Sequence, residues 1–369
     1  MRPSVPLGGV CLVIAGQSPD GSFYNAHGQG LPFYQGKKEF GERYIGAPTT
    51  WTTEVTKEAQ EGDILISVRA PVGPINFATQ RMCIGRGLAA IRCDGSKLHR
   101  DFLFYQLLFK RPEISGKQGA VFASINKADI EAIQIWLPHA DEQRRIVAIL
   151  DEAFEGIATA KAHAEKNLRN ARELFSSEAK SIFMRGAARW PTKTVDQLST
   201  NLDSKRVPIT KSDRKAGEFP YYGASGIVDY VADYIFDGDT LLVSEDGANL
   251  LARSTPIAFS VSGRYWVNNH AHILKFGSMA TQKFVEFYLE SIPLDEYITG
   301  AAQPKLNQKA LNSIPIPIPA TLDEQAEVVD RLERGMEQSE QLHGVYKRKL
   351  ATLDELKQSL LHQAFSGAL

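Results

Sequence analysis

Residues 137–143 read Leu-Pro-His-Ala-Asp-Glu-Gln, and residues 318–325 read Ile-Pro-Ala-Thr-Leu-Asp-Glu-Gln. Each stretch leads into about 45 residues without proline, 141–185 and 323–365, that are rich in Ala, Leu, Glu, Lys, Arg and Gln. These residue types are good helix formers. Proline breaks a helix, and the aspartate of each stretch can cap the helix that follows it. The sequence therefore predicts two long helices.

Apolar residues recur along both predicted helices at alternating steps of three and four, the spacing of a coiled-coil seam. The predicted seam residues are Ile146, Leu150, Ile157 and Leu174 in the first helix and Val329, Leu332, Leu350, Leu353 and Leu360 in the second. A helix of about 45 residues is ~65 Å long, so a protruding pair is favoured over two helices of a core bundle. The second helix buries its seam if it runs back antiparallel along the first.

The repetition extends beyond these two stretches. Residues 119–126 (Gly-Ala-Val-Phe-Ala-Ser-Ile-Asn) correspond to residues 300–307 (Gly-Ala-Ala-Gln-Pro-Lys-Leu-Asn). Asn126 and Asn307 end the two stretches, and we interpret both as cap or turn residues before a last strand. Further short matches occur upstream in the same order in both halves. An internal repeat of this kind predicts that one structural unit is built twice.

Short apolar runs between turn residues predict strands in both halves, and two longer segments predict short helices. The predicted strands are 64–68, 89–91, 133–137, 240–243 and 256–261, and the predicted short helices are 99–109 and 282–291. The predicted fold class is α+β, with two similar globules separated by two long antiparallel helices in a pseudo-two-fold repeat. The predicted domains are a first globule (1–138), a first helical region (139–186), a second globule (187–319) and a second helical region (320–369).

The composition is that of an ordinary globular protein. Of 369 residues, 43% are hydrophobic and 23% are charged, which excludes disordered and collagen-like classes. No run approaches the ~18 apolar residues of a membrane span, and the first residues lack the apolar core of a signal peptide. Three cysteines without a CxxC pair argue against a disulfide framework or a zinc site and fit a reducing cytoplasm.

Motifs of catalysis are missing from the sequence. It contains no GxxxxGK[ST] phosphate loop, no HExxH and no GxGxxG after a predicted strand. It also contains no Asn-Pro-Pro-aromatic or Asp-Pro-Pro-aromatic tetrapeptide, so an amino-methyltransferase site is not expected. Residues 223–226 (Gly-Ala-Ser-Gly) are one residue short of a nucleophile elbow and predict a turn. We therefore expect no catalytic residue and no resident metal.

Two groups of side chains keep alternatives open. His270 and His272 would lie on one face of a strand, where a metal could bind, although a contact with DNA or the core is favoured. The acidic residues between 237 and 246 could bind Mg²⁺ as in a nuclease, but the expected neighbouring lysine is absent. The acidic residues motivate a stand-alone endonuclease as an alternative function, and the near-neutral net charge motivates a protein-binding adaptor with tandem domains.

Several features of the sequence together point to a known family. They are the doubled layout, the Pro…Asp-Glu-Gln entry into each helix, Cys-Ile-Gly-Arg-Gly-Leu-Ala-Ala-Ile at 83–91, Asn-Asn-His-Ala-His at 268–272 and Phe-Ser-Gly at 365–367. With them the whole chain resembles the DNA specificity (S) subunit of a type I restriction-modification system. Because the chain starts directly at the first globule, we expect no additional N-terminal helix of the kind some members carry.

The resemblance implies a function and partners. Two target recognition domains would each read one half of a split site on double-stranded DNA, and the helices would fix the unread spacer. Two methyltransferase (M) subunits would dock on the helices and methylate adenine N6 with S-adenosylmethionine, and restriction (R) subunits would add an ATP- and Mg²⁺-dependent nuclease. This chain itself would hold no cofactor and catalyse nothing. The setting would be cytoplasmic, with no membrane partner.

The net charge of −1 predicts weak DNA binding by the chain alone, because phosphate contacts dominate non-specific affinity. Local basic and amide residues nevertheless provide candidates for phosphate and base-edge contacts. The candidate DNA-binding residues are Lys37, Lys38, Arg43, Arg69, Arg86, Gln118, Lys205, Arg206, Lys211, Arg214, Lys215, Tyr221, Asn249, Asn268, Asn269 and Gln303.

Overall fold

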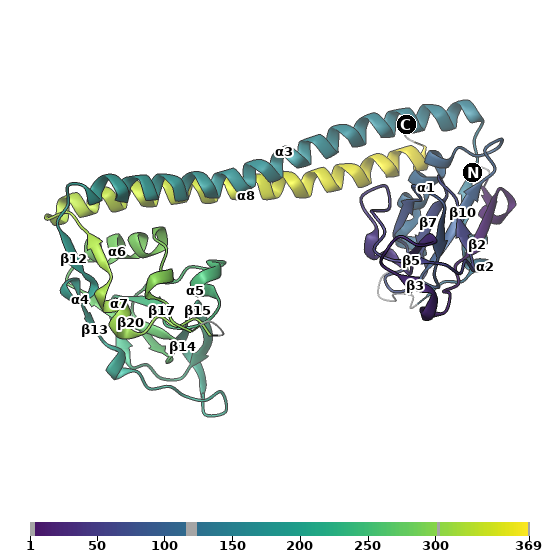
Figure 1. Ribbon diagram of the computed structural model, residues 1–369. Helices are drawn as coiled ribbons and strands as arrows, with labels where there is room; N and C mark the ends of the chain where they lie inside the picture. Colours follow the sequence, from purple (N-terminus) through teal and green to yellow (C-terminus); the bar gives the residue numbers. More distant parts are fainter. Residues whose placement is uncertain (1–3, 116–123, 301–302, 368–369) are drawn as a thin grey trace. The chain divides into compact units, whose positions relative to one another are not determined.

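The computed structural model describes residues 4–115, 124–300 and 303–367. The chain forms two compact units (Figure 1): unit 1 holds Met1–Ala164 with Lys349–Leu369, and unit 2 holds Glu165–Arg348. Each unit contains one mixed domain of strands and short helices together with a part of each long helix.

Unit 1 contains two sheets and a separate strand pair. The strand orders are β2-β10-β7-β8 and β3-β5-β4-β9-β6, and β1 pairs with β11. The elements are β1 (Ser4–Pro6), β2 (Cys11–Ala15), β3 (Tyr24–Asn25), β4 (Leu31–Tyr34), β5 (Trp51–Thr52), β6 (Glu58–Ala59), β7 (Ile64–Ser67), β8 (Ile75–Phe77), β9 (Met82–Ile84), β10 (Leu88–Cys93), α1 (Arg100–Ile114), α2 (Lys127–Glu131) and β11 (Gln134–Trp136).

Unit 2 repeats this topology. Its strand orders are β13-β20-β17-β18 and β15-β14-β19-β16, and β12 pairs with β21. The elements are β12 (Thr192–Thr194), α4 (Val195–Leu198), β13 (Ser199–Asn201), β14 (Ala216–Gly223), β15 (Gly226–Val231), β16 (Phe236–Asp237), β17 (Thr240–Ser244), α5 (Asn249–Ala252), β18 (Ala258–Val261), β19 (Arg264–Val267), β20 (Ala271–Phe276), α6 (Met279–Ser291), α7 (Gln308–Ser313) and β21 (Pro315–Pro317). β14 pairs with β19 in parallel, as β4 does with β9. The predicted internal repeat is therefore confirmed.

Each domain has three layers because the central strands are apolar on both faces. In β7, Ile64 and Ile66 belong to the core that includes α1, whereas Leu65 belongs to the core between the two sheets. In β17, Leu241 and Leu242 divide between the corresponding cores of unit 2 in the same way. Successive side chains of a strand point to opposite faces, so one continuous apolar run serves two cores.

The two predicted long helices are α3 (Ala140–Ala187) and α8 (Leu322–Ser366), of 48 and 45 residues. In unit 1, Lys161 of α3 pairs with Asp354 of α8. In unit 2, the Ser339 hydroxyl donates to the Ala171 carbonyl at 2.9 Å, and Arg331 pairs with Glu178 at 2.8 Å. Residue numbers rise along α3 as they fall along α8, so the helices run antiparallel within unit 2, as predicted.

Most of the predicted seam is buried or half-buried. Ile146 and Leu150 join the α1 core of unit 1, and Val329 and Leu332 join the α6 core of unit 2. Ile157 is buried, while Leu350, Leu353 and Leu360 are half-buried. The helix seam thus continues directly into the core of each domain.

Leu174 is the exception, and the prediction is wrong for this residue because its surface is 67% exposed. The buried face passes instead from Ala171 to Phe175 and Ala179. Two consecutive steps of four shift the seam, since an α-helix with 3.6 residues per turn drifts away from a strict 3.5-residue repeat.

The glutamine at the end of each opening stretch is buried and holds a helix entry together. The Gln143 side chain accepts from the His99 amide at 2.7 Å and donates to the Pro138 carbonyl at 2.9 Å. Gln325 accepts from the Thr281 hydroxyl and donates to the Pro319 carbonyl. Both helices begin one residue before the aspartate, so these aspartates lie in the first turn, where negative charge is favourable, rather than at the cap.

The predicted shorter elements are also present. The strands at 64–68, 89–91, 133–137, 240–243 and 256–261 match β7, β10, β11, β17 and β18, and the two short helices match α1 and α6. Asn126 and Asn307 cap α2 and α7, accepting from the amides of Asp129 and Ala310. Among the described residues, no helix is long and apolar enough to cross a membrane.

Candidate nucleic-acid interface

Hydrogen-bond register shows which residues of the two domains are equivalent. Leu88 pairs with Ser67 in unit 1, and Ala271 pairs with Ser244 in unit 2. Two residues after Ser67 and Ser244, β-bridges join Arg69 to Ser124 in unit 1 and Asp246 to Lys305 in unit 2. The equivalent positions, unit 1 first, are Ala15 and Asp203, Val68 and Glu245, Arg69 and Asp246, Arg86 and Asn269, and Ala89 and His272.

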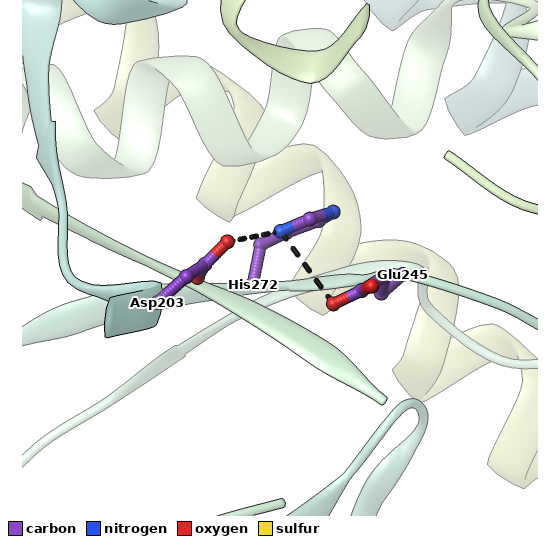
Figure 2. Close-up of side chains that lie close together, drawn as sticks. All are labelled: Asp203, Glu245 and His272. Carbon is purple, nitrogen blue, oxygen red and sulfur yellow. Dashed lines mark hydrogen bonds and ion pairs between the residues drawn. The ribbon is translucent and has the colours of Figure 1, made fainter. Parts of the chain in front are cut away.

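A buried charge cluster of Asp203, Arg206, Glu245 and His272 occupies this place in unit 2. Figure 2 shows Asp203, Glu245 and His272 of this cluster. His272 Nδ1 lies 2.5 Å from Asp203 Oδ2, and its Nε2 lies 2.7 Å from the Leu306 carbonyl oxygen. A carbonyl oxygen only accepts, so Nε2 is the donor to Leu306, and Nδ1 is the ring atom that faces the Asp203 carboxylate. Asp203 also accepts from the Ile273 amide at 2.9 Å.

Cations compensate the two carboxylates of the buried charge cluster. Arg206 donates to Glu245 at 2.6 Å, and Lys305 lies 3.1 Å from the same carboxylate. Burial raises the pKa of Asp203, but its bonds to His272 and Ile273 outweigh burial and leave that pKa below its usual value. For Glu245 too, burial is outweighed, by Arg206, His272 and Lys305, and the pKa is lowered. Both acids are therefore carboxylates held by protein cations.

This arrangement does not fit a metal centre. Asp203, Glu245 and His272 offer ligand atoms within 4.8 Å of one another, the only such group of three or more among the described residues. However, a metal ion would have to displace Arg206 and Lys305 from Glu245. Of the alternatives left open for His272, which were a metal, a DNA contact and a core contact, the core contact is the one found.

The other acidic residues that could have bound Mg²⁺ in a nuclease do not lie together at one site. Asp237 pairs with Arg264 at 3.2 Å, and Asp246 pairs with His270 at 2.9 Å. Glu245 belongs to the buried charge cluster, and Asp239 joins no group of potential metal ligands among the residues described. His270 and His272 bind different carboxylates, so they do not form a metal pair.

Unit 1 has an open pocket of about 470 Å³ at the equivalent place, which we call the basic pocket. Ala15, Val68 and Ala89 are among its lining residues, and so are Arg69 and Arg86. Both arginines are exposed, and no ion pair of either is found in the described part of the chain. The basic pocket therefore presents two free guanidinium groups beside small apolar side chains.

Lys127 also lines the basic pocket and was not predicted from the sequence. Its Nζ lies 3.5 Å from Glu131, one turn along α2. The internal repeat could have pointed to Lys127, because Lys127 follows the cap residue Asn126 as Gln308 follows the cap residue Asn307.

Other predicted contacts lie on the surface. Lys37 and Lys38 are exposed in a single 3-10 turn, residues Lys37–Glu39. Further exposed candidates, all in unit 2, are Lys205, Lys211, Lys215, Asn269 and Gln303. Gln118 lies outside the described residues.

Six of the residues predicted to contact DNA form bonds or packing contacts within the protein. Arg43 binds Asp101 at 2.6 Å and Asp151 at 2.7 Å, and Arg206 belongs to the buried charge cluster. Arg214 lies over the buried ring of Tyr221, 4.4 Å from its centre, and pairs with Asp229.

Two asparagines are also internal: Asn249 bonds to the backbone of Thr255, and buried Asn268 accepts from the His270 amide. Residue type predicted all six contacts, but each of these side chains has a partner within the protein.

Comparison with known proteins identifies the protein family to which the chain is similar. The model of the type I restriction modification DNA specificity domain matches the chain twice, at residues 4–168 and 188–345. A protein of Methanocaldococcus jannaschii, assigned as the type I restriction enzyme MjaX specificity subunit, is 43% identical over 162 residues, or 44% of this chain and 38% of that protein. The type I restriction enzyme EcoDI specificity subunit of Escherichia coli is 41% identical over 66 residues, 18% of this chain and 15% of that protein. The matches thus span well under half the length of these relatives.

Solved structures share the fold. A chain from a structure described as showing complex assembly and conformational transition of the type I R-M system is 17% identical, with a TM-score of 0.81 and full coverage of both chains. The HsdS subunit of Thermoanaerobacter tengcongensis is 18% identical, with a TM-score of 0.59 over 100% of this chain and 97% of that one. Since the family model matches twice and covers most of the sequence, the chain belongs to the type I restriction-modification DNA specificity family.

Proposed function

We propose that this chain is the DNA-reading subunit of a type I restriction-modification complex. Residues 1–138 and 187–319 act as two target recognition domains, and each reads one half of a bipartite site on double-stranded DNA. Residues 139–186 and 320–369 are the helical regions that set the unread spacer. The observation that carries the proposal is one topology built twice in a single polypeptide, with both long helices continuing through both units.

The helices support a measuring role. A continuous α-helix of 48 residues rises ~1.5 Å per residue, and its dimensions change little because every interior amide is hydrogen-bonded. In each unit the helices share buried residues with the domain core, for example Leu150 in unit 1 and Leu332 in unit 2. Each domain is thereby fixed to its part of the helices, which is what a constant spacing between two reading surfaces requires.

The chemistry is assigned to partners. An enzyme that methylates adenine N6 extrudes the base from the duplex, and the described residues of this chain provide no arrangement for that reaction. We propose that two M subunits bound to the helices supply S-adenosylmethionine chemistry, and that R subunits supply the nuclease with ATP and Mg²⁺. This chain holds no cofactor of its own, and the complex works in the cytoplasm, where the DNA lies.

Reconstitution with the M subunit of the same system tests this function. The purified chain alone should neither methylate DNA nor cleave a plasmid with Mg²⁺. Addition of the M subunit and S-adenosylmethionine should give adenine methylation at one defined sequence. Methylation or cleavage by the chain alone would contradict the assignment, and so would a complex that gains no DNA affinity over its separate components.

A further inference from the structure

One place in the fold is built in opposite ways in the two domains. In unit 2 the buried charge cluster fills it, with Asp203, Glu245 and His272 pointing toward one another (Figure 2). In unit 1 the equivalent residues are Ala15, Val68 and Ala89. Unit 1 has no charged side chain at these three positions, and all three residues line the basic pocket.

The chemistry of the basic pocket defines what it can bind. Arg69, Arg86 and Lys127 line it, and no described lining residue is acidic. Of these cations only Lys127 has an ion-pair partner in the described structure, Glu131. Guanidinium groups only donate hydrogen bonds, so the complementary ligand is a group with two adjacent acceptors. On DNA these are a phosphate or the O6 and N7 edge of guanine.

The second domain distinguishes between the two. Phosphate is the same on every sequence, so a phosphate-binding position of this fold should be basic in both domains. The residues equivalent to Arg69 and Arg86 are Asp246 and Asn269. A carboxylate such as that of Asp246 repels phosphate. Arginine only donates hydrogen bonds, whereas the Asp246 carboxylate accepts them and the Asn269 amide can do both. Such a difference in side-chain chemistry is what two domains that read different bases require.

We propose that Arg69 and Arg86 form a specificity pocket that reads guanine in the half-site bound by unit 1. The proposal rests on the proposed DNA-reading function and adds a base and the residues that select it. The equivalent pair in unit 2, Asp246 and Asn269, does not select guanine.

The test uses the complex of the full chain with its M subunit. Binding and methylation are measured on a DNA panel that carries each base at each position of both half-sites, at one fixed salt concentration. The wild-type complex should require guanine in one half-site. Arg69→Ala and Arg86→Ala should each reduce the preference for that guanine on the order of 10- to 100-fold, with the preferences of the other half-site unchanged.

Two further variants separate base reading from charge. Arg69→Lys keeps the charge but replaces the rigid planar fork by a single flexible ammonium, so it should weaken the guanine preference while the affinity for other sequences is kept. Arg81→Ala removes an exposed arginine of unit 1 whose guanidinium is already held by Glu58 at 2.6 Å, and it should leave every preference unchanged. Unchanged circular dichroism and thermal unfolding establish that the variants are folded.

Several results would overturn the proposal. Equal weakening on all sequences, with Arg69→Lys behaving as wild type, would identify a phosphate contact instead. Full guanine preference in both alanine variants would remove these arginines from the interface. A wild-type complex that selects a bipartite site without guanine in either half would refute the pocket but leave the proposed function intact, whereas a complex without any sequence preference would refute both.

Discussion

Replacement of Asp203 by Asn tests whether the buried charge cluster holds unit 2 together. The Asp203 carboxylate binds His272 Nδ1 at 2.5 Å and the Ile273 amide at 2.9 Å, and its side chain is only 7% exposed. Asn keeps the volume and can still accept from Ile273. It presents a neutral amide in place of the carboxylate that His272 Nδ1 contacts, and Arg206 loses a carboxylate 3.6 Å away.

Removal of one partner from a buried ion pair costs about 3–5 kcal/mol. Because one hydrogen bond survives, we expect about 3 kcal/mol, the lower end of that range. A chain of two units need not unfold in one step, so native-state hydrogen exchange is the suitable assay. Amides of β20 should exchange on the order of 100-fold faster, at ~1.4 kcal/mol per tenfold change. Amides of β10 in unit 1 should be unaffected.

Asp237→Asn is the matched control, since Asp237 pairs with Arg264 but is 58% exposed. Exposed pairs contribute at most about 1 kcal/mol, so β20 exchange should change little. A β20 acceleration below about threefold in Asp203→Asn, or equal effects of the two substitutions, would refute the reasoning.

The Asp203 carboxylate also predicts that unit 2 loses stability in acid. The pKa of Asp203 is lowered from its ordinary value of 3.8 in the fold. A lowered pKa means that the stabilisation is complete above the unfolded value and is lost as the pH falls through the folded one. Unit 2 should therefore lose stability below about pH 4, and Asp203→Asn should make that slope shallower. An unchanged slope in the variant would contradict the assignment.

Three further predictions concern packing, capping and thiols. Leu332→Ala should destabilise unit 2 by about 2–5 kcal/mol in exchange experiments, whereas Leu174→Ala, at an exposed site, should change stability by less than about 0.5 kcal/mol; equal effects would contradict the described seam. Asn307→Ala should cost about 1 kcal/mol, measured at the α7 amides, and a neutral result would exclude the cap. Contact with the Cys11 thiol, 4.0 Å away, and burial raise the pKa of Cys93, so alkylation of Cys93 at neutral pH should be far slower than that of a free cysteine; equal rates would refute the burial.

Periodicity predicted the long helices well because their signal is local. Helix formers without proline, between 141 and 185 and between 323 and 365, define α3 and α8 to within a few residues. Leu174 was misplaced because a heptad cannot show where two steps of four shift the seam. The shift depends on Phe175 and Ala179, which pack into the core of unit 2.

The environment of the candidate interface residues was less predictable, because residue type does not reveal partners within the protein. Arg206 and Arg214 looked equivalent in a basic loop, yet Glu245 and Asp229, both distant in sequence, hold them. The basic pocket lies where strands, a loop and α2 meet, and no spacing rule connects these segments. Its relation to the buried charge cluster of unit 2 lies in the strand registers, which pair residues that differ in type.

We propose that α3 and α8 hold two reading domains at one spacing. The most direct measurement is a genome-wide map of methylated adenine in cells that express this chain with its M subunit. We predict a single motif with two specified half-sites separated by a constant number of unspecified bases. One contiguous motif, or two half-sites found at variable spacing, would contradict the claim.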